Sequence, residues 1–338
     1  MPTFPFLRLP ILIQLLILKN ASLLDQFLIS LTSKRSKQML KSLNLSLFKL
    51  KWSLDGNPGC QNLKLFHPHN RGFPCYHETF NIYINRENQI PSEQLNFNGT
   101  VLEVSRGSSY ISIQNISHRK SFKLMDQLTK HVLEIFNVPN FDLSWKNVTK
   151  LSEWFVWKHT RSFSHVHLID WHILEPVLTS LDAKVLLEHV TITDRLDLLV
   201  EVEEGFEFFG PLKIKSFSTR FAPWLKLEAF LTMDCERVSF YQSSLTYQDM
   251  NAIIKTWLSG GIKNLREFKS HVCDPTPGLS TEDKLDRILD GVTWDNHPED
   301  NRGRNIHRSD GTMANVNVRD IGVRLESGFE LCVSAVKN

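Results

Sequence analysis

The fold of the N-terminus is decided by one stretch, Phe4-Pro5-Phe6-Leu7-Arg8-Leu9-Pro10-Ile11-Leu12-Ile13-Gln14-Leu15-Leu16-Ile17-Leu18-Lys19. Proline fixes φ near the helical value and has no amide hydrogen to lose, so Pro10 suits the first turn of a helix. Only Gln14 interrupts the apolar residues that follow, so this helix is apolar on nearly all sides. Such a helix has to be buried on more than one side.

Two further short helices are expected directly after the first. Ser22 is an N-cap candidate with Asp25 three residues later, ahead of apolar residues up to Leu31. The basic run Ser33-Lys34-Arg35-Ser36-Lys37 then leads into a third helix that ends near Leu43. Three helices of about forty residues in total form a marginal core on their own. We therefore expect another protein to supply the rest of this core.

This order of a Leu-Pro start, a short apolar helix and a basic helix resembles an F-box. The resemblance implies that residues 1–45 bind the Skp adaptor of a cullin-based SCF ubiquitin ligase, and reach the cullin through that adaptor. The adaptor-binding residues that it implies are Leu7, Leu9, Pro10, Ile13, Ile17, Leu23 and Leu24. Gln14, Leu15 and Leu16 depart from the usual family pattern. Two alternatives stay open: a family member that no longer recruits the ligase, and a helical hairpin that packs on the chain's own core.

A third alternative is a secreted, glycosylated binding protein. Arg8 and the apolar run fit the n- and h-regions of a signal peptide. The chain also has five Asn-x-Ser/Thr sequons, at Asn20, Asn44, Asn98, Asn115 and Asn147. However, no Ala-x-Ala-like cleavage site follows, and five cysteines, at positions 60, 75, 235, 273 and 332, do not suggest a disulfide framework. We therefore favour a reducing, intracellular location, cytoplasmic and/or nuclear.

Bulk composition excludes several partner classes. The 338 residues include 39 basic and 37 acidic ones, and the formal net charge is +2, so no global bias favours nucleic acid. The apolar run near the N-terminus is shorter than the roughly twenty residues of a transmembrane helix. The 22 Phe and 8 Trp residues argue against disorder. We expect neither nucleic acid nor membrane among the partners.

Residues 46–150 alternate short apolar segments with turn signals, which predicts a small β-rich linking module. Strands are expected over 46–52, 101–104 and 110–113, and Asn98-Gly99 is a strong hairpin signal. Apolar residues at helical spacing then predict a helix over 121–136 at the end of the module. Within it, Cys60, His67, His69, Cys75 and His77 lack the paired Cys-x2-Cys arrangement of structural zinc sites, so no metal site is expected.

Residues 151–270 show self-similarity at a step of 24 residues. Short strand candidates begin at Val166, Val190, Ile214 and Val238, each separated from the next by helical or loop segments. This step lies in the length range of leucine-rich-type repeats. The expected fold is therefore α+β or α/β: a three-helix F-box, a β-rich middle module, and a leucine-rich-repeat-like solenoid ending in a β-hairpin. The corresponding domain bounds are 1–45, 46–150, 151–270 and 271–338.

The last repeat unit has the clearest local signals. Thr246 is an N-cap with Asp249 at the N3 position, Trp257 belongs to an apolar helix face, and Gly260-Gly261 ends the helix. The stretch from Leu245 to Leu265 resembles the type-2 F-box-associated domain of a large nematode F-box family. The resemblance extends to residues 306–314, which look like that family's terminal hairpin with an Asp-Gly turn.

Polar residues flank the apolar strand positions and should lie on the opposite face of the sheet. We expect this polar, partly basic face to bind a target protein, because concave solenoid faces commonly bind proteins. The substrate-binding candidates are His167, Thr191, Lys213, Lys215, Arg237 and Ser239. The alternating histidines do not predict a metal site, because no carboxylate or thiol accompanies them at a suitable spacing in the sequence.

No motif for catalysis or cofactor binding is present. Gly-x-Gly-x-x-Gly, the Walker loop, the Gly-x-Ser-x-Gly elbow and His-Glu-x-x-His are all absent from the sequence. His307-Arg308-Ser309-Asp310 has the wrong spacing for a kinase catalytic loop. We therefore expect a non-catalytic substrate receptor of an SCF-type ubiquitin ligase, without a cofactor.

Overall fold

The computed structural model describes residues 6–55, 61–67, 79–85, 90–147, 150–169, 178–273, 279–296, 303–321 and 326–334. The described chain is a mixed α/β structure, as predicted, and divides into two compact units. The first unit comprises Met1–Lys146 and Trp154–Phe163, and the second comprises Asn147–Glu153 and Ser164–Asn338. The finer division into four domains stays a prediction.

The N-terminal helices begin where the sequence places their caps. Their bounds are η1, a 3-10 helix (Phe6–Arg8), α1 (Ile11–Asn20), α2 (Leu23–Thr32) and α3 (Lys34–Ser42). The Ser22 hydroxyl accepts a hydrogen bond from the backbone N–H of Asp25 at 3.1 Å, and Ser33 caps α3 in the same way. The predicted three-helix N-terminus is confirmed, because each helix starts at its expected residue.

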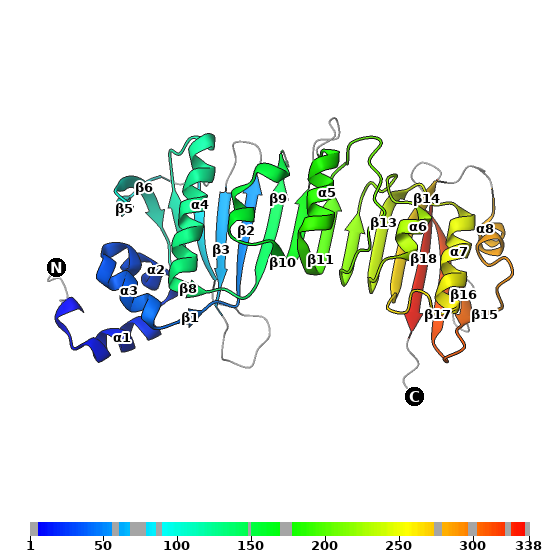
Figure 1. Cartoon of the computed structure of the whole chain (residues 1–338), viewed down its shortest axis with the longest axis horizontal. Coiled ribbons are helices and arrows are strands. Elements are labelled where there is room, and N and C mark those ends of the chain that lie inside the picture. The colour runs from blue at the N-terminus through cyan, green and yellow to red at the C-terminus, as the bar shows by residue number, and fades with distance from the viewer. Residues whose placement is uncertain are drawn as a thin grey trace. The chain divides into compact units, whose positions relative to one another are not determined.

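The first unit also contains a β-sheet with helices on one face (Figure 1). Its other elements are β1 (Leu45–Ser46), β2 (Lys49–Asp55), β3 (Gln61–Phe66), β4 (Thr79–Ile84), β5 (Glu93–Phe97), β6 (Thr100–Arg106), β7 (Tyr110–Ile113), α4 (His118–Ile135), β8 (Phe136–Asn137), β9 (Phe141–Lys146) and the 3-10 helix η3 (Phe155–Lys158). The strand order is β9-β2-β3-β4-β7-β6-β5, and β1 pairs separately with β8. The hairpin at Asn98-Gly99 is confirmed, since both residues have positive φ between β5 and β6. The predicted helix is confirmed as α4.

Alternation along the strands decides which face of this sheet meets the helices. In β2, Leu50, Trp52 and Leu54 are at most 2% exposed, and the residues between them are only half-buried. Trp52 Nε1 donates a hydrogen bond to Thr129 Oγ1 of α4 at 3.0 Å. The Phe80 ring of β4 lies 5.3 Å from that of Phe27 in α2. The apolar face therefore packs against α2 and α4, and the alternate residues point away from these helices.

The second unit is built on a mixed sheet with α5, α6 and α7 on one face (Figure 1). Its elements are η2 (Leu151–Glu153), β10 (Ser162–Ile169), α5 (Ser180–His189), β11 (Thr191–Leu199), β12 (Ser216–Thr219), α6 (Leu227–Leu231), β13 (Arg237–Ser243), α7 (Tyr247–Leu258), β14 (Glu267–Cys273), α8 (Thr281–Ile288), β15 (Trp294–Asn296), β16 (Gly303–His307), β17 (Met313–Ile321) and β18 (Glu326–Ser334). Strands β11 to β14 are parallel, whereas β14, β18, β17, β16 and β15 pair antiparallel in that order.

The core of this unit lies between the strands and their helices. The Phe230 ring of α6 lies 6.0 Å from Phe240 of β13 and 4.6 Å from Phe268 of β14. Trp257 of α7 is completely buried. The capping box of Thr246 and Asp249 is confirmed, and so is the terminal hairpin, whose turn contains Gly311 at φ 84°.

The predicted repeat step of 24 residues is wrong for the paired strands. Arg195 pairs with Ser216 and Ser216 with Arg237, which is a step of 21 residues, and Arg237 then pairs with Glu267, a step of 30. The steps differ because α6 has five residues and α7 has twelve, so the connections between strands are unequal. A leucine-rich-repeat-like solenoid is therefore not confirmed by the register.

Candidate functional site

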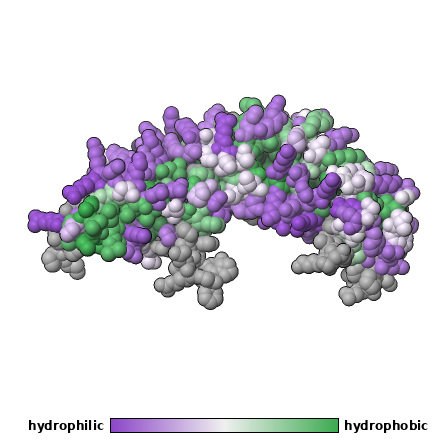
Figure 2. Space-filling model, turned by 60° about the horizontal axis from the view of Figure 1, so that its bottom comes forward, coloured by the Kyte–Doolittle hydropathy of each residue, from purple (hydrophilic) through white to green (hydrophobic). Residues whose placement is uncertain are grey.

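Helix α1 presents an exposed apolar face. The exposed fractions are 74% for Leu12, 58% for Leu16, 49% for Ile11, 43% for Ile13 and 38% for Ile17. Figure 2 shows the corresponding hydrophobic surface at the end of the molecule that carries the N-terminal helices. A contiguous apolar patch on a protein surface marks an interaction site. This face is the first candidate functional site.

The opposite side of α1 is the buried one, and it carries the one polar residue of the run. Gln14 is 1% exposed, and its Nε2 donates a hydrogen bond to the Leu9 carbonyl at 2.5 Å. Leu18, one turn later, is fully buried in a small cluster with Met39 and Leu40 of α3. Gln14 therefore joins α1 to the Leu-Pro segment that precedes it, and Ile11, Leu12, Ile13, Leu16 and Ile17 are left outside.

The structure divides the predicted adaptor-binding residues into two groups. Pro10, Ile13 and Ile17 are exposed and Leu9 is half-buried, so all four are accessible on one side of the N-terminal helices. Leu23 and Leu24 are 2% and 8% exposed, because they form the inner side of α2. Leu7 lies in η1, and its side chain is outside the described residues. The sequence did not single out Leu12 and Leu16, the two most exposed large hydrophobic residues of α1, as adaptor-binding residues.

Helix α2 is fixed to the rest of the first unit by a buried histidine of α4. His131 is 5% exposed, and its Nε2 lies 2.7 Å from Ser30 Oγ of α2. Its ring also contacts the edges of Phe27 and Phe97, at 5.7 and 5.6 Å between centroids. Burial, together with the nearby charge of Lys37, lowers the pKa of His131 from 6.5 to about 4. The imidazole is therefore neutral at physiological pH.

A second candidate site is the sheet face of the second unit that points away from α6, here called the open face. Residues of the open face occupy the strand positions between the buried ones, and the register aligns them in two rows. These residues are Arg195, Asp197, Ser216, Ser218, Arg237, Ser239, Glu267 and Lys269. Arg237 and Ser239, both predicted substrate-binding residues, therefore lie on this face.

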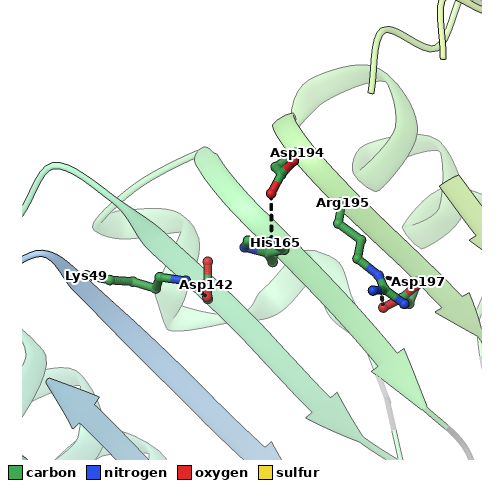
Figure 3. Close-up of polar contacts among 6 residues, drawn as sticks. All are labelled: Lys49, Asp142, His165, Asp194, Arg195 and Asp197. Carbon is green, nitrogen blue, oxygen red and sulfur yellow. Dashed lines mark hydrogen bonds and ion pairs between the residues drawn. The ribbon is translucent and has the colours of Figure 1, made fainter. Parts of the chain in front are cut away.

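Carboxylates pair with the histidines at the β10 end of the second unit. His167 Nδ1 lies 3.0 Å from Asp197 Oδ2, and Arg195 Nε donates to Asp197 Oδ1 at 2.9 Å. His165 Nε2 lies 2.9 Å from Asp194 Oδ2 (Figure 3). Burial opposes ionisation of Asp197, but the hydrogen bonds from His167 and Arg195 outweigh it and lower the pKa of this carboxyl.

The sequence offered no carboxylate at a suitable spacing from these histidines, and the two aspartates that pair with them come from the neighbouring strand. Asp194 and Asp197 lie far from His165 and His167 in the sequence, and only the pairing of neighbouring strands brings them together. Sequence spacing within one strand contains no signal for such a pair.

The structure places the other predicted substrate-binding residues differently. Thr191 is exposed at the first position of β11. Lys213 and Lys215 are exposed but precede β12, which begins at Ser216 rather than at Ile214. They were expected on the strand itself because the 24-residue step placed it two residues too early. The two lysines consequently do not belong to the rows of the open face.

One group of potential metal ligands occurs among the described residues, at Glu267, Glu330 and Cys332. Lys269 Nζ already lies between the two carboxylates, 2.6 Å from Glu267 and 3.1 Å from Glu330. Burial and the adjacent Glu330 raise the pKa of the Cys332 thiol to about 11, which keeps it protonated. A lysine therefore already bridges the two carboxylates of this group. Of the Cys/His group considered in the sequence, all but His67 lie outside the described residues.

Comparisons with known families identify both ends of the chain. The family model of the F-box domain matches residues 6–48, which include α1, α2 and α3. The family model described as F-box associated matches residues 206–270, from before β12 into β14. The chain thus contains an F-box domain and, nearer the C-terminus, an F-box-associated domain, as the sequence resemblance implied. Proteins with these domains are typically non-catalytic substrate receptors. No curated protein and no solved structure matches the chain.

The helices were also compared with the dimensions of a lipid bilayer. Among the described residues, no helix combines the length and the hydropathy that crossing a membrane requires.

Proposed function

We propose that the protein is the substrate-receptor subunit of an SCF-type ubiquitin ligase. The N-terminal helices bind the Skp adaptor, which connects them to the cullin, and the C-terminal domain binds a target protein. Holding the target beside a ubiquitin-charged enzyme raises the effective concentration of its lysines. The receptor needs no catalytic group or cofactor of its own for this role.

The observation that carries the proposal is the exposed face of α1. Its five large aliphatic side chains are 38% to 74% exposed on a helix of ten residues. Burying such side chains fully stabilises by about 1.5–3 kcal/mol each, so leaving them in water is unfavourable. The F-box match covers the same residues. An adaptor that packs on this face supplies the missing half of the core.

Target binding is proposed for the open face of the second unit. Arg237 and Ser239 lie in its rows, His167 lies at its β10 end, and the F-box-associated match covers β12 and β13. Thr191, Lys213 and Lys215 are exposed at strand beginnings and can contact a target from the rim. Because the charges at both ends of the rows are already paired, specificity here rests on hydrogen bonds rather than on net charge.

The sequons that added weight to the secreted alternative have a backbone explanation. Four of the five sequon asparagines, Asn44, Asn98, Asn115 and Asn147, have positive φ between 46° and 59°. Asparagine tolerates this left-handed conformation better than most residues do, so its recurrence at these turns has a backbone reason. We propose an intracellular location, in which these residues act in turns rather than as glycosylation sites.

The test is a titration of the full chain with purified Skp adaptor. Replacing both outermost residues, Leu12→Gln with Leu16→Gln, should weaken binding by about 2 kcal/mol, a roughly thirtyfold rise in Kd. Glutamine favours helices, so α1 should still form. The matched control is Leu181→Gln on α5, where the leucine is 64% exposed. Equal affinity of the double variant and the wild type, or an equal loss in the control, would contradict the proposal.

A further inference from the structure

The sheet face of the first unit that points away from α4 is basic. Lys49 and Lys51 of β2 and Lys64 of β3 alternate with the buried residues that pack under the helices. The three side chains therefore share one face. We call Lys49, Lys51, Lys64 and Phe66 the lysine face.

Within the described part of the chain, two charges of the lysine face have no ionic partner. Lys51 lies directly opposite Lys64 in the antiparallel pair β2–β3, where like charges are destabilising. Asp142 is the register neighbour of Lys51 in β9, but its Oδ2 binds Lys49 Nζ at 2.7 Å (Figure 3). Among the residues that the structure describes, no carboxylate forms an ion pair with Lys51 or Lys64. This face therefore complements a negatively charged partner.

The aromatic ring on this face holds the lysines in position. Lys64 Nζ lies 5.0 Å and Lys49 Nζ 5.8 Å from the centroid of the Phe66 ring, which is cation–π geometry. A single-stranded nucleic acid would need open rings on which its bases could stack. Since two ammonium groups already lie against Phe66, the lysine face favours a polypeptide with carboxylates over a nucleic acid.

We infer that the lysine face binds an acidic, extended segment of a partner protein. Residues on one face of an extended segment repeat every two positions, or about 6.6 Å, so such a segment offers a row of carboxylates, one of which contacts Lys51. Lys64 supplies a further contact from the neighbouring strand. The inference goes beyond the proposed function, because it assigns a docking surface outside both matched domains. The inference rests on the proposed receptor role in one respect only: that role would make the bound partner a target of the ligase.

The test measures binding of a fluorescently labelled peptide of alternating glutamate and serine to the full chain by anisotropy. The wild type should bind this peptide, should not bind the same sequence with lysine in place of glutamate, and should lose affinity as salt is added. Lys51→Gln with Lys64→Gln should lower affinity about tenfold, since two charge contacts are removed. The matched control is Lys123→Gln with Lys130→Gln, which removes the same charge from exposed positions on α4.

A second variant separates binding from folding. Lys64→Glu places opposite charges across β2 and β3, so it should raise the midpoint of thermal unfolding and abolish peptide binding.

Three results would overturn the inference: no binding of the glutamate peptide, an equal loss in the α4 control, or tighter binding of a single-stranded oligodeoxynucleotide. Adaptor affinity, measured on the same variants, should not change. A failure of the receptor role therefore appears in the adaptor titration, and a failure of the lysine face appears in the peptide titration.

Discussion

Helices α1 and α7 are both rich in apolar residues, but the chain covers only one of them. In α7, Met250, Ile253, Ile254 and Trp257 are all fully buried against the sheet of the second unit. In α1, Leu12 and Leu16 are 74% and 58% exposed, and the buried positions are Gln14 and Leu18. The difference shows that apolar sequence alone does not locate a core. A glutamine inside α1, with most of its leucines and isoleucines outside, supports the proposed binding of a partner on this helix.

The caps at the helix ends also differ between α7 and α1. A full capping box begins α7, and Gly260 with φ 81° follows its end. No side-chain hydrogen bond caps the start of α1. Helix α7 is thus stabilised by its own chain, whereas the proposed partner would add most to the stability of α1.

The largest expected effect is on the covered helix. Trp257→Ala should lower the free energy of unfolding of the second unit by about 4 kcal/mol, because the indole is completely buried. Leu12→Ala, the matched change on α1, should cost less than about 0.5 kcal/mol. Chemical denaturation of both variants measures the difference. Similar losses would mean that α1 is packed in solution and that the comparison fails.

The next effect concerns how α2 is held, and it depends on pH. His131 has a pKa of about 4 in the folded protein and 6.5 when unfolded, so the unfolded chain binds more protons between these values. Stability from the neutral ring is fully present above pH 6.5 and should fall by about 3 kcal/mol as pH drops to 4.

Denaturation of the wild type and of His131→Gln across this pH range provides the measurement. The glutamine variant should lack this component of the pH dependence. If the free energy of unfolding changes with pH by the same slope in both proteins, His131 does not control how α2 is attached.

A smaller effect is expected for the residues just before α1. Leu9→Ala combined with Pro10→Ala should weaken adaptor binding by at least about 2 kcal/mol, as for a buried hot spot. Pro10 is exposed in the free chain, so the stability of the first unit should change little. Calorimetric titration with the adaptor, alongside thermal unfolding, separates the two quantities. Unchanged affinity would restrict the site to the face of α1 itself.

The smallest expected effect concerns the capping box of α7 and its contribution to the stability of that helix. Asp249 Oδ2 accepts a hydrogen bond from the backbone N–H of Thr246 at 2.8 Å, so Asp249→Ala should destabilise α7 by about 1 kcal/mol. Gln248→Ala is the control, because this exposed neighbour is outside the capping box. Urea unfolding resolves a difference of this size. Because alanine favours helices more than glutamine or aspartate does, a loss of equal size in the control would mean that the capping box does not account for the effect.

Several elements were predictable because their signals are local. The caps at Ser22 and Thr246, the turn at Asn98-Gly99 and the terminal Asp-Gly turn each depend on neighbouring residues alone. The repeat step was not predictable, because it depends on how long each connection is once α6 and α7 have packed. Lys213 and Lys215 were consequently placed on a strand that begins only at Ser216.

The sequence by itself determined where the three N-terminal helices begin, and it determined the capped amphipathic helix that starts after Thr246. Only the tertiary structure decided which apolar residues stay exposed, that Asp197 approaches His167, and that Lys51 lies opposite Lys64. The physical reason is range. Caps and turns are set by contacts a few residues apart, whereas strand register and burial are set by the packing of segments distant in the chain.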